Sequence, residues 1–317
     1  MNAISEQDAA AHGITTDKHR LLRARHWASR LNIFARRAAS SALLGHARSR
    51  FRGRGMEFEE VRRYQAGDDI RTIDWKVTAR NPGTYTKLFC EERERPCYVI
   101  IDQRSSLFFG SGERFKSVLA AELGSALAWA ALAAGDRIGA QIIGDNSEID
   151  IRARNSRKAV LTLIESVHTL NCQLLNRKTI ENSLQEYPKQ FKSLSYYLEE
   201  CVRIVRPGSA VFIISDFNDF DALCTRALSK ISKRADTSLL QIYDPLEKSL
   251  PKTGTLPISD GINSSNVRLT KQLTHSYHRS LSKRDMLVQN AAMQSNSYLA
   301  NISTKTSARQ ALSQIYR

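Results

Sequence analysis

Two uninterrupted apolar runs, each leading to an aspartate, constrain the fold of this chain more than any other feature. They are CYVII before Asp102 and SAVFIIS before Asp216. A strand with one face in water alternates apolar and polar side chains, whereas a run without alternation is typical of a strand covered on both faces. Strands of that kind occur in parallel sheets with helices on both sides.

The segments around these runs alternate between strand and helix patterns. Strands are expected over residues 97–102, 136–143, 147–153, 209–215, 237–243 and 297–302, and a hairpin over 255–269. Helices are expected over 115–134, 156–170, 192–205, 221–234, 273–294 and 308–316. This order predicts an α/β fold with a doubly wound, mostly parallel sheet, in which the second and third strands pair as a hairpin.

The texture of the sequence changes twice before this α/β pattern begins. We therefore expect three regions: a basic helical N-terminal segment over residues 1–47, a small subdomain rich in charge, aromatic residues and glycine over 48–96, and the α/β domain over 97–317. The apolar fraction of 42% and the charged fraction of 25% are those of an ordinary globular protein, which excludes wholesale disorder.

The net charge of +15 is concentrated at the ends of the chain. Lys18 to Arg54 hold eleven basic and no acidic residues, whereas residues 55–247 sum to −1. In Arg20 to Leu44 the apolar residues fall on one helical stripe, with arginines opposite. We expect this segment to be a separable basic surface for an acidic partner, a membrane surface or a nucleic acid. A solvated helix packed on the body is the alternative.

The sequence predicts a soluble protein of the cytoplasm. The longest apolar stretch, Val118 to Ala134, contains Glu122, so we expect a buried helix there rather than a transmembrane segment. The N-terminus lacks the hydrophobic region of a signal peptide. The five cysteines show no paired spacing, which fits a reducing compartment and argues against a zinc site or a disulfide framework.

The two aspartates that follow the apolar runs define the candidate site. In doubly wound sheets, ligands bind at the carboxyl ends of the strands, near the point where the strand order reverses. Asp102 and Asp216 are expected at this edge, with Ser106 on the loop that follows the first of them. Carboxylate and hydroxyl oxygens are ligands that Mg2+ accepts in proteins.

This arrangement resembles the von Willebrand factor A domain, whose metal-ion-dependent adhesion site has the pattern Asp-x-Ser-x-Ser after the first strand. Asp102 and Ser106 match the first and last positions, and Asp216 matches an aspartate that such sites take from a later strand. Such sites also take a threonine from a loop, for which Ser193 is the best candidate here and Thr179 the second. The resemblance implies a Mg2+ site formed by these residues.

One position departs from that pattern. Arg104 occupies the place of the middle serine. A fixed positive charge there repels a metal ion and can neutralise Asp102 or Asp216 itself. We therefore expect a degenerate site, with Arg104 as an internal counter-ion and no cofactor; a working Mg2+ site is the alternative.

The most specific signal lies upstream, in the string RRYQAGDDIRTIDW over residues 62–75 and the Ala79-Arg80 pair that follows. The string resembles the signature of a bacterial family called domain of unknown function 58, in which it precedes a von Willebrand-type strand. The resemblance extends over about residues 45–317. It implies a protein that works with a MoxR-type AAA+ ATPase in the assembly, maturation or activation of a client protein complex, and it implies no enzymatic activity.

The signature also has a physical interpretation. Its main residues are Arg63, Tyr64, Gly67, Asp68, Asp69, Arg71, Asp74 and Trp75. The Gly-Asp-Asp part is typical of a turn, and the alternation of arginines and aspartates makes an ion-pair network available. Two roles are open: a network that stabilises a small subdomain, which we favour for Asp68, Asp74 and Trp75, or a docking surface for a partner.

Other catalytic patterns, such as a nucleophile elbow, a phosphate-binding loop or a zinc helix, are absent from the sequence. His275 and His278 lie within one helical turn, but no nearby residue completes a metal site. We therefore expect a non-enzymatic interaction protein. The alternatives are a nucleic-acid-binding protein acting through the basic N-terminal segment, which we do not favour, and a metal-dependent enzyme at Asp102 and Asp216.

Overall fold

The computed structural model describes residues 13–33, 56–91, 95–145, 147–175, 192–251, 253–259 and 264–316. The chain divides into two units, one of residues 1–39 with 95–317 and one of residues 40–94. Each unit is described by itself.

The larger unit is built on a six-stranded sheet with the strand order β10-β7-β6-β3-β4-β5. The strands are β3 (Pro96–Asp102), β4 (Arg137–Ile143), β5 (Glu148–Arg154), β6 (Ser209–Ser215), β7 (Ala235–Tyr243) and β10 (Tyr298–Ser303). All neighbours pair in parallel except β4 and β5, which are antiparallel. The chain enters at β3, continues outward to β5, and then crosses to β6 on the other side. The predicted doubly wound, mostly parallel α/β sheet and its hairpin are confirmed.

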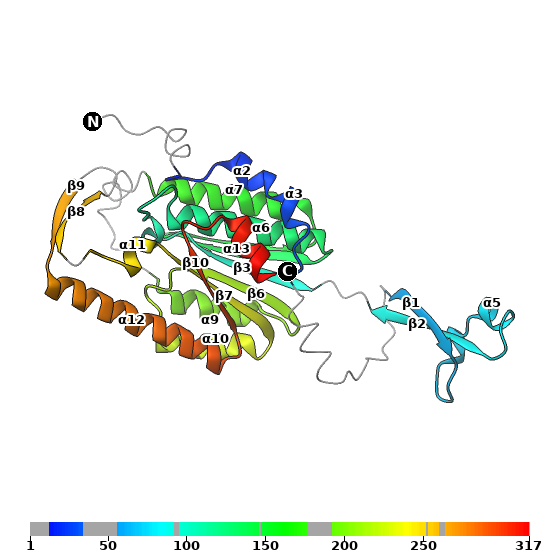
Figure 1. Cartoon of the computed structure of the whole chain (residues 1–317). Coiled ribbons are helices and arrows are strands. Elements are labelled where there is room, and N and C mark those ends of the chain that lie inside the picture. The colour runs from blue at the N-terminus through cyan, green and yellow to red at the C-terminus, as the bar shows by residue number, and fades with distance from the viewer. Residues whose placement is uncertain are drawn as a thin grey trace. The chain divides into compact units, whose positions relative to one another are not determined.

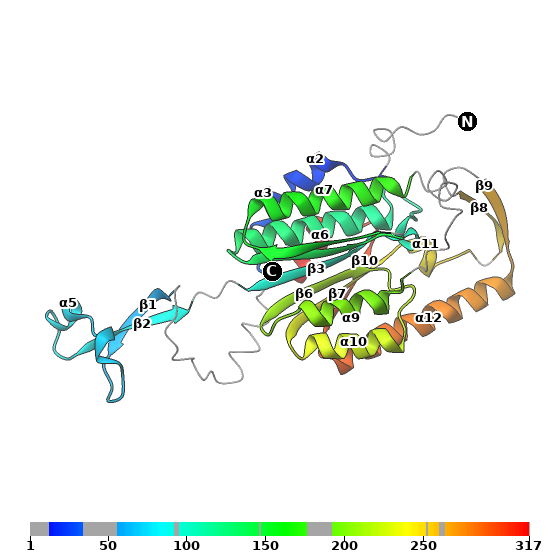
Figure 2. The same cartoon turned by 180° about the vertical axis from the view of Figure 1, so that it is seen from behind.

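Helices cover both faces of this sheet, as Figures 1 and 2 show. On one face lie α6 (Lys116–Ala133), α7 (Arg157–Gln173) and α13 (Ala308–Ile315), and on the other lie α9 (Leu194–Ile204), α10 (Ala222–Ser232) and α12 (Lys271–Gln294). Each face has its own apolar cluster, to which the central strands contribute alternate side chains. The central strands are therefore apolar throughout because neither face meets water.

Helix α6 is the central helix of the first face. It is long and apolar enough to cross a membrane by length and composition, with a mean hydropathy of 1.2, and 89% of it is buried within the structure. This burial is that of a core helix, as predicted.

Helix α6 packs closely against β3 at Gly124. A Cβ added at Gly124 would lie 2.3 Å from Cδ1 of Ile101 on β3. Glycine at this position therefore allows the helix to pack closely against the central strand.

The described part of the N-terminal segment packs on the same face. It forms two short helices, α2 (Lys18–Arg23) and α3 (Arg25–Ala28), rather than one continuous helix. Leu21 is 1% exposed and joins the apolar cluster around α6. Arg20 pairs with the buried Glu122 of α6 at 2.8 Å. The buried side chains of residues 13–33 thus join the core of the larger unit, so this part of the segment follows the alternative of a helix packed on the body rather than a separable surface. The rest of the expected helix, from residue 34 to 44, lies outside the described residues.

Two shorter features complete the larger unit. The predicted hairpin is formed by β8 (Gly254–Ser259) and β9 (Ser264–Leu269), which pair in antiparallel fashion. The short helices η2 (Ser105–Leu107) and α11 (Pro245–Lys248) follow β3 and β7. Both therefore lie at the edge where the parallel strands end, which is the edge of the candidate site.

The smaller unit contains the signature segment. Its strands β1 (Met56–Arg63) and β2 (Tyr85–Glu91) pair in antiparallel fashion, and η1 (Ile70–Thr72) and α5 (Trp75–Thr78) lie between them in the sequence. Gly67 has a φ of 105°, a left-handed backbone angle that favours glycine. The turn expected at the Gly-Asp-Asp sequence is therefore present.

Candidate functional site

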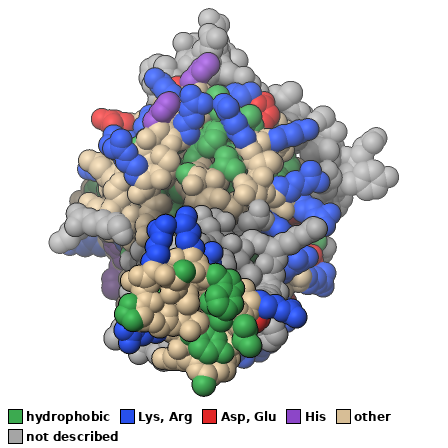
Figure 3. Space-filling view, turned by 90° about the vertical axis from the view of Figure 1, so that its right-hand side faces the viewer, with side chains coloured by type: hydrophobic (Ala, Val, Ile, Leu, Met, Phe, Trp, Pro, Cys, Tyr) green, Lys and Arg blue, Asp and Glu red, His purple; other side chains and the backbone are tan. Residues whose placement is uncertain are grey.

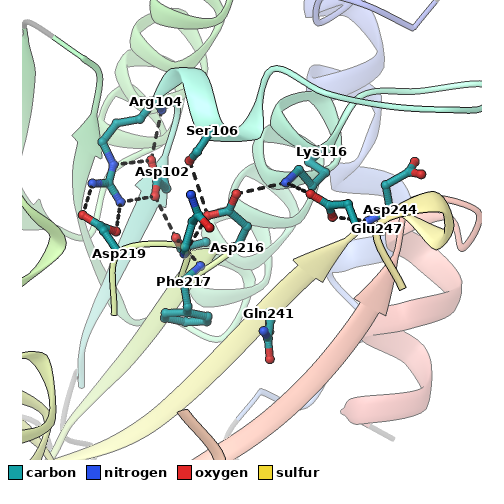
Figure 4. A network of polar contacts seen from close by, with 12 residues as sticks. Asp102, Arg104, Ser106, Lys116, Asp216, Phe217, Asp219, Gln241, Asp244 and Glu247 are labelled. Atoms are coloured by element: carbon teal, nitrogen blue, oxygen red, sulfur yellow. Dashed lines mark hydrogen bonds and ion pairs between the residues drawn. The ribbon is translucent and has the colours of Figure 1, made fainter. Parts of the chain in front are cut away.

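Asp102 and Asp216 lie side by side at the carboxyl edge of the sheet. Asp102 ends β3, Asp216 follows β6, and these two strands pair in parallel through Ile101 and Ile214. The strand order reverses between them, which is where doubly wound sheets form their sites. Figure 4 shows the two carboxylates within one network of polar contacts.

Asp102 has no solvent-exposed surface, and both of its oxygens accept hydrogen bonds. Oδ1 accepts from the backbone amide and Nε of Arg104, each at 3.0 Å. Oδ2 accepts from Nη2 of Arg104 and from Oγ of Ser215, each at 2.7 Å. Burial raises the pKa of Asp102, against the opposing effect of the Arg104 charge. The arginine thus occupies the side of Asp102 that a metal ion would need.

Arg104 also binds a second carboxylate. Its Nη1 and Nη2 donate to Oδ2 and Oδ1 of Asp219 at 2.6 and 2.9 Å. Asp219 in turn accepts from the backbone amide of Leu194, at the start of α9, at 2.9 Å. Burial alone raises the pKa of Asp219, but the hydrogen bonds from Arg104 and Leu194 outweigh it and the pKa lies below its usual value. Arg104 therefore connects the ends of β3 and β6 to the start of a helix.

Asp216 has a cation of its own, Lys116 at the start of α6. The side chain of Lys116 is only 2% exposed, and its Nζ lies 3.0 Å from Oδ2 of Asp216 and 2.6 Å from Oε1 of Glu247. Burial alone lowers the pKa of Lys116, but the two carboxylates outweigh it and raise the pKa. Ser106 donates to Oδ1 of Asp216 over a long 3.4 Å. A second internal cation thus neutralises the second candidate carboxylate.

The network continues through Glu247 to Asp244, which is fully buried. Glu247 accepts from the backbone amide of Asp244 at 2.9 Å. Asp244 accepts from the Ser111 amide at 3.0 Å and from Oγ1 of Thr304, beyond β10, at 2.8 Å. Burial alone raises the pKa of Asp244, but the hydrogen bonds that it accepts, first of all from the Ser111 hydroxyl, outweigh burial and lower the pKa. The network therefore joins loops from β3, β6, β7 and β10 along one edge.

The backbone next to Asp216 is strained. Phe217 has a φ of 53° although it is a bulky residue with a fully buried ring, and such an angle costs free energy for a residue other than glycine. Its amide donates to Oγ of Ser215 at 3.0 Å, the same hydroxyl that donates to Asp102. The strained turn thus fixes Ser215, which donates to Asp102, and Asp216, which pairs with Lys116.

The structure brings Asp102, Ser106 and Asp216 together but does not connect Ser193 to them. Ser193 precedes α9, and its hydroxyl lies 2.7 Å from that of Ser195. Thr179, the second candidate for this position, lies outside the described residues.

This set of side chains does not fit a divalent cation. Magnesium takes oxygen ligands and keeps several waters, whereas Asp102 and Asp216 already lie 2.7 and 3.0 Å from the nitrogen of a cationic side chain. A metal ion would have to displace both Arg104 and Lys116 from buried partners. In the part of the chain that the structure describes, no group of three or more His, Cys, Asp or Glu residues has the arrangement of a metal site.

Sequence reasoning missed four charged members of the network: Lys116, Asp219, Asp244 and Glu247. Lys116 left a signal, because a lysine directly before a long apolar helix needs a partner when the helix is buried. Asp219 follows Asp216 by three residues, so it was a candidate by proximity. Glu247 lies 131 residues from Lys116, and no local pattern joins the two.

The signature aspartates act within the smaller unit. Asp68 accepts from Nη2 of Arg62 at 2.7 Å. Asp69 caps η1 by accepting from the Arg71 amide at 2.9 Å. Asp74 caps α5, and its other oxygen lies 3.4 Å from Nζ of Lys87. The Asp74 pKa is lowered, most by the Val77 amide, with burial opposing and Lys87 adding to the effect.

Within the part of the chain that the structure describes, the ion pairs of the signature aspartates therefore involve Arg62 and Lys87. Among the described residues, the guanidinium groups of Arg63, Arg71 and Arg80 form no ion pair with a carboxylate. Tyr64 donates to the carbonyl of Asp68 at 3.2 Å. Trp75 is 68% exposed, so its ring is not part of a packed core in this unit.

Comparisons with known proteins agree with the sequence signature. The profile of the family described as "Protein of unknown function DUF58" matches residues 60–287. Uncharacterized proteins from Mycobacterium bovis and from two strains of Mycobacterium tuberculosis are 27% identical over 209 residues, which is 66% of this chain and 61% of each relative. The chain thus spans about three fifths of the length of these relatives.

Among solved structures, the chain is similar to a von Willebrand factor type A protein from Catenulispora acidiphila. The identity is 13% and the TM-score 0.30, over 50% of this chain and 35% of that chain. The α/β fold is therefore assigned from the strand order of the sheet and not from the similarity to that structure. Because the family profile matches more than half of the residues, the chain belongs to the DUF58 family of proteins of unknown function.

Proposed function

We propose that this protein is a non-enzymatic interaction module that works with a MoxR-type AAA+ ATPase in the assembly or maturation of a client protein complex in the cytoplasm. The ATPase supplies the energy of nucleotide hydrolysis, and this chain recognises proteins. Two features support the proposal: a carboxylate network in which Arg104 and Lys116 pair with Asp102 and Asp216, and a signature segment with exposed apolar side chains.

The single observation that supports an interaction role most directly is the exposure of two large apolar side chains in the signature. Trp75 is 68% exposed and Ile70 is 65% exposed. Tryptophan is enriched among the residues that contribute most to protein interfaces. The aspartates around these side chains cap η1 and α5. The capped turns thus position apolar side chains for a partner.

Co-purification with a tagged MoxR-type ATPase from the same genome tests this proposal, with ATP, with ADP and without nucleotide. Trp75→Ala is expected to weaken the association by about 2 kcal/mol or more, the usual cost of a central interface tryptophan. Its melting temperature should equal that of the parent chain. Leu223→Ala is the matched control, because Leu223 is also a large exposed apolar residue, at 52%, but lies in the other unit. Absence of association in all three nucleotide states contradicts the proposal.

We further propose that the carboxyl edge of the sheet is a structural network that works without a metal. The support is that Arg104 and Lys116 already occupy the carboxylates of Asp102 and Asp216. Isothermal titration with Mg2+ and Mn2+ should show no binding at millimolar concentration. Binding that is lost in Asp102→Ala would revive the alternative of a metal-dependent enzyme, and phosphatase and nuclease assays with Mn2+ would then be the next measurements.

A further inference from the structure

A pocket of about 680 Å3 opens on the surface of the larger unit, between the N-terminal helices and the helices of the first face. It is lined by Asp17, His19, Leu22, Arg23, Arg25, His26, Trp129, Arg157 and Leu161. None of the residues in the network around Asp102 and Asp216 lines it. The volume is within the range of ligand-binding pockets in proteins, roughly 300–1,000 Å3.

The pocket combines apolar and basic side chains. Leu22 is half-buried, Trp129 is 6% exposed and Leu161 is 38% exposed. Three arginines, two histidines and Asp17 are the other described residues of the lining. Figure 3 views the molecule from the right-hand side of Figure 1 and shows apolar side chains in its upper part, with basic and histidine side chains around them.

The pocket arginines differ from their neighbours in having no carboxylate partner. Among the described residues, Arg23, Arg25 and Arg157 form no ion pair, and Arg25 only donates to Nε2 of His26 at 3.3 Å. By contrast, Arg20 on the same helix as Arg23 pairs with Glu122 at 2.8 Å.

Asp17 is the one carboxylate among the described residues that line the pocket. Its Oδ1 caps α2 by accepting from the His19 amide at 2.8 Å. With neutral histidines, three arginines against one aspartate leave a charge of +2 around an apolar surface. Guanidinium groups without partners are well suited to pair with carboxylates, since they can donate two parallel hydrogen bonds.

We infer that this pocket binds an acidic segment of a partner protein, in which carboxylates flank an apolar side chain. The carboxylates pair with Arg23, Arg25 and Arg157, and the apolar side chain lies against Leu22 and Leu161. The inference rests on the proposed interaction role and adds to it the chemistry of one partner segment.

The geometry favours a peptide over the other anionic polymers and surfaces. Nucleic-acid sites that bind bases stack them on exposed aromatic rings, but Trp129 is buried and its Nε1 donates to the carbonyl of Leu21 at 3.3 Å. A membrane site presents apolar side chains that protrude into the lipid, whereas the apolar side chains here line a hollow and only Leu161 among them exceeds one-third exposure.

Fluorescence anisotropy of the full chain with a labelled peptide of alternating glutamate and leucine tests the inference at 150 mM salt. Two further probes replace leucine by alanine or glutamate by lysine. We expect Arg23→Glu/Arg25→Glu/Arg157→Glu to weaken binding of the first peptide by about tenfold or more, since hydrogen bonds between charged groups contribute strongly. Leu161→Ser should also weaken it, by less. The alanine peptide should bind more weakly than the leucine peptide, and the lysine peptide should not bind.

The matched control is Arg226→Glu/Lys233→Glu/Arg309→Glu, which reverses three exposed charges elsewhere on the same unit. It should change the affinity by less than about twofold, because only general electrostatic attraction is reduced. Equal losses in the two triple variants would overturn the inference. The inference would also be overturned if the pocket triple variant lost more affinity for duplex DNA, or for vesicles containing phosphatidylglycerol, than for the peptide.

The titration contains no ATPase, so its result is independent of the co-purification result. A chain that binds the peptide but no ATPase supports the pocket inference and contradicts the ATPase proposal.

Discussion

Arginine side chains are used in opposite ways at the sheet edge and at the N-terminal pocket. Arg104 is 12% exposed and donates to two carboxylates, Asp102 and Asp219. Arg23 and Arg157 are exposed and form no ion pair among the described residues. All three residues are arginines, and all three lie in the larger unit. The difference is therefore made by burial and by the neighbours that the fold supplies.

Structural charges and available charges differ in whether they need a partner within the protein. A charge that is buried in the protein must have a partner, because desolvation costs several kcal/mol. An exposed guanidinium on apolar surface has no such need, so its pairing capacity remains open to another molecule. We therefore interpret the sheet edge as structure and the pocket as a binding surface, and four predictions test that contrast.

The largest effect is expected at the buried cation. Lys116→Met removes the cation that Asp216 and Glu247 share and leaves two carboxylates without an ion-pair partner, so we expect it to lower the free energy of unfolding by about 3–5 kcal/mol. Urea denaturation measures this. Lys233→Met, at an exposed lysine, is the control and should change the value by less than about 0.5 kcal/mol. Equal stability of the two variants would mean that the network does not stabilise the fold.

The second prediction concerns the buried side of the helix that carries Arg23. Leu21 is 1% exposed within the main apolar cluster. Leu21→Ala should therefore cost about 3 kcal/mol through lost apolar contact and a residual cavity. Leu273→Ala, at a leucine that is 45% exposed, should cost less than about 1 kcal/mol. A negligible loss for Leu21→Ala would show that the N-terminal segment is separable after all.

The third prediction uses acid to break the network at Asp244. Its pKa is lower in the folded chain than in the unfolded chain, so the unfolded state binds the proton more readily. The stabilisation is fully present above the unfolded value, about 3.9, and disappears as the pH falls through the folded value. Asp244→Asn should therefore be less stable than the parent chain at pH 7, and the gap should close in acid. Urea denaturation from pH 7 downward measures it, and a gap independent of pH contradicts the assignment.

The smallest effect is expected at the pocket. Arg157→Ala removes an exposed side chain with no partner among the described residues, so the free energy of unfolding should change by less than about 0.5 kcal/mol. Urea denaturation measures this change in the free energy of unfolding. A loss comparable to that of Lys116→Met would show that Arg157 stabilises the fold, and the contrast between the two sites would then fail.

Much of the fold could be predicted from local patterns. The apolar runs that end at Asp102 and Asp216 correctly indicated central parallel strands, because a strand covered on both faces must be apolar throughout. The turn at Gly67 was visible because a left-handed backbone favours glycine. The stripe around Leu21 was also visible, but a stripe only shows that a helix has an apolar face. The stripe does not show which part of the protein covers that apolar face, so the sequence did not predict that the segment packs on α6.

The sequence by itself determined the family, the α/β class and the position of two carboxylates at one edge of the sheet, since each depends on residues close together in the chain. The tertiary structure decided which charges meet. Lys116 and Asp216 are 100 residues apart, and the pocket takes its lining from residues 17–26 and 129–161. Side chains so distant become neighbours only when the sheet and its helices are assembled. Coulomb interactions and desolvation act on those neighbours, so the assembled fold, and not the local sequence, separates a network of internal ion pairs from an open basic pocket.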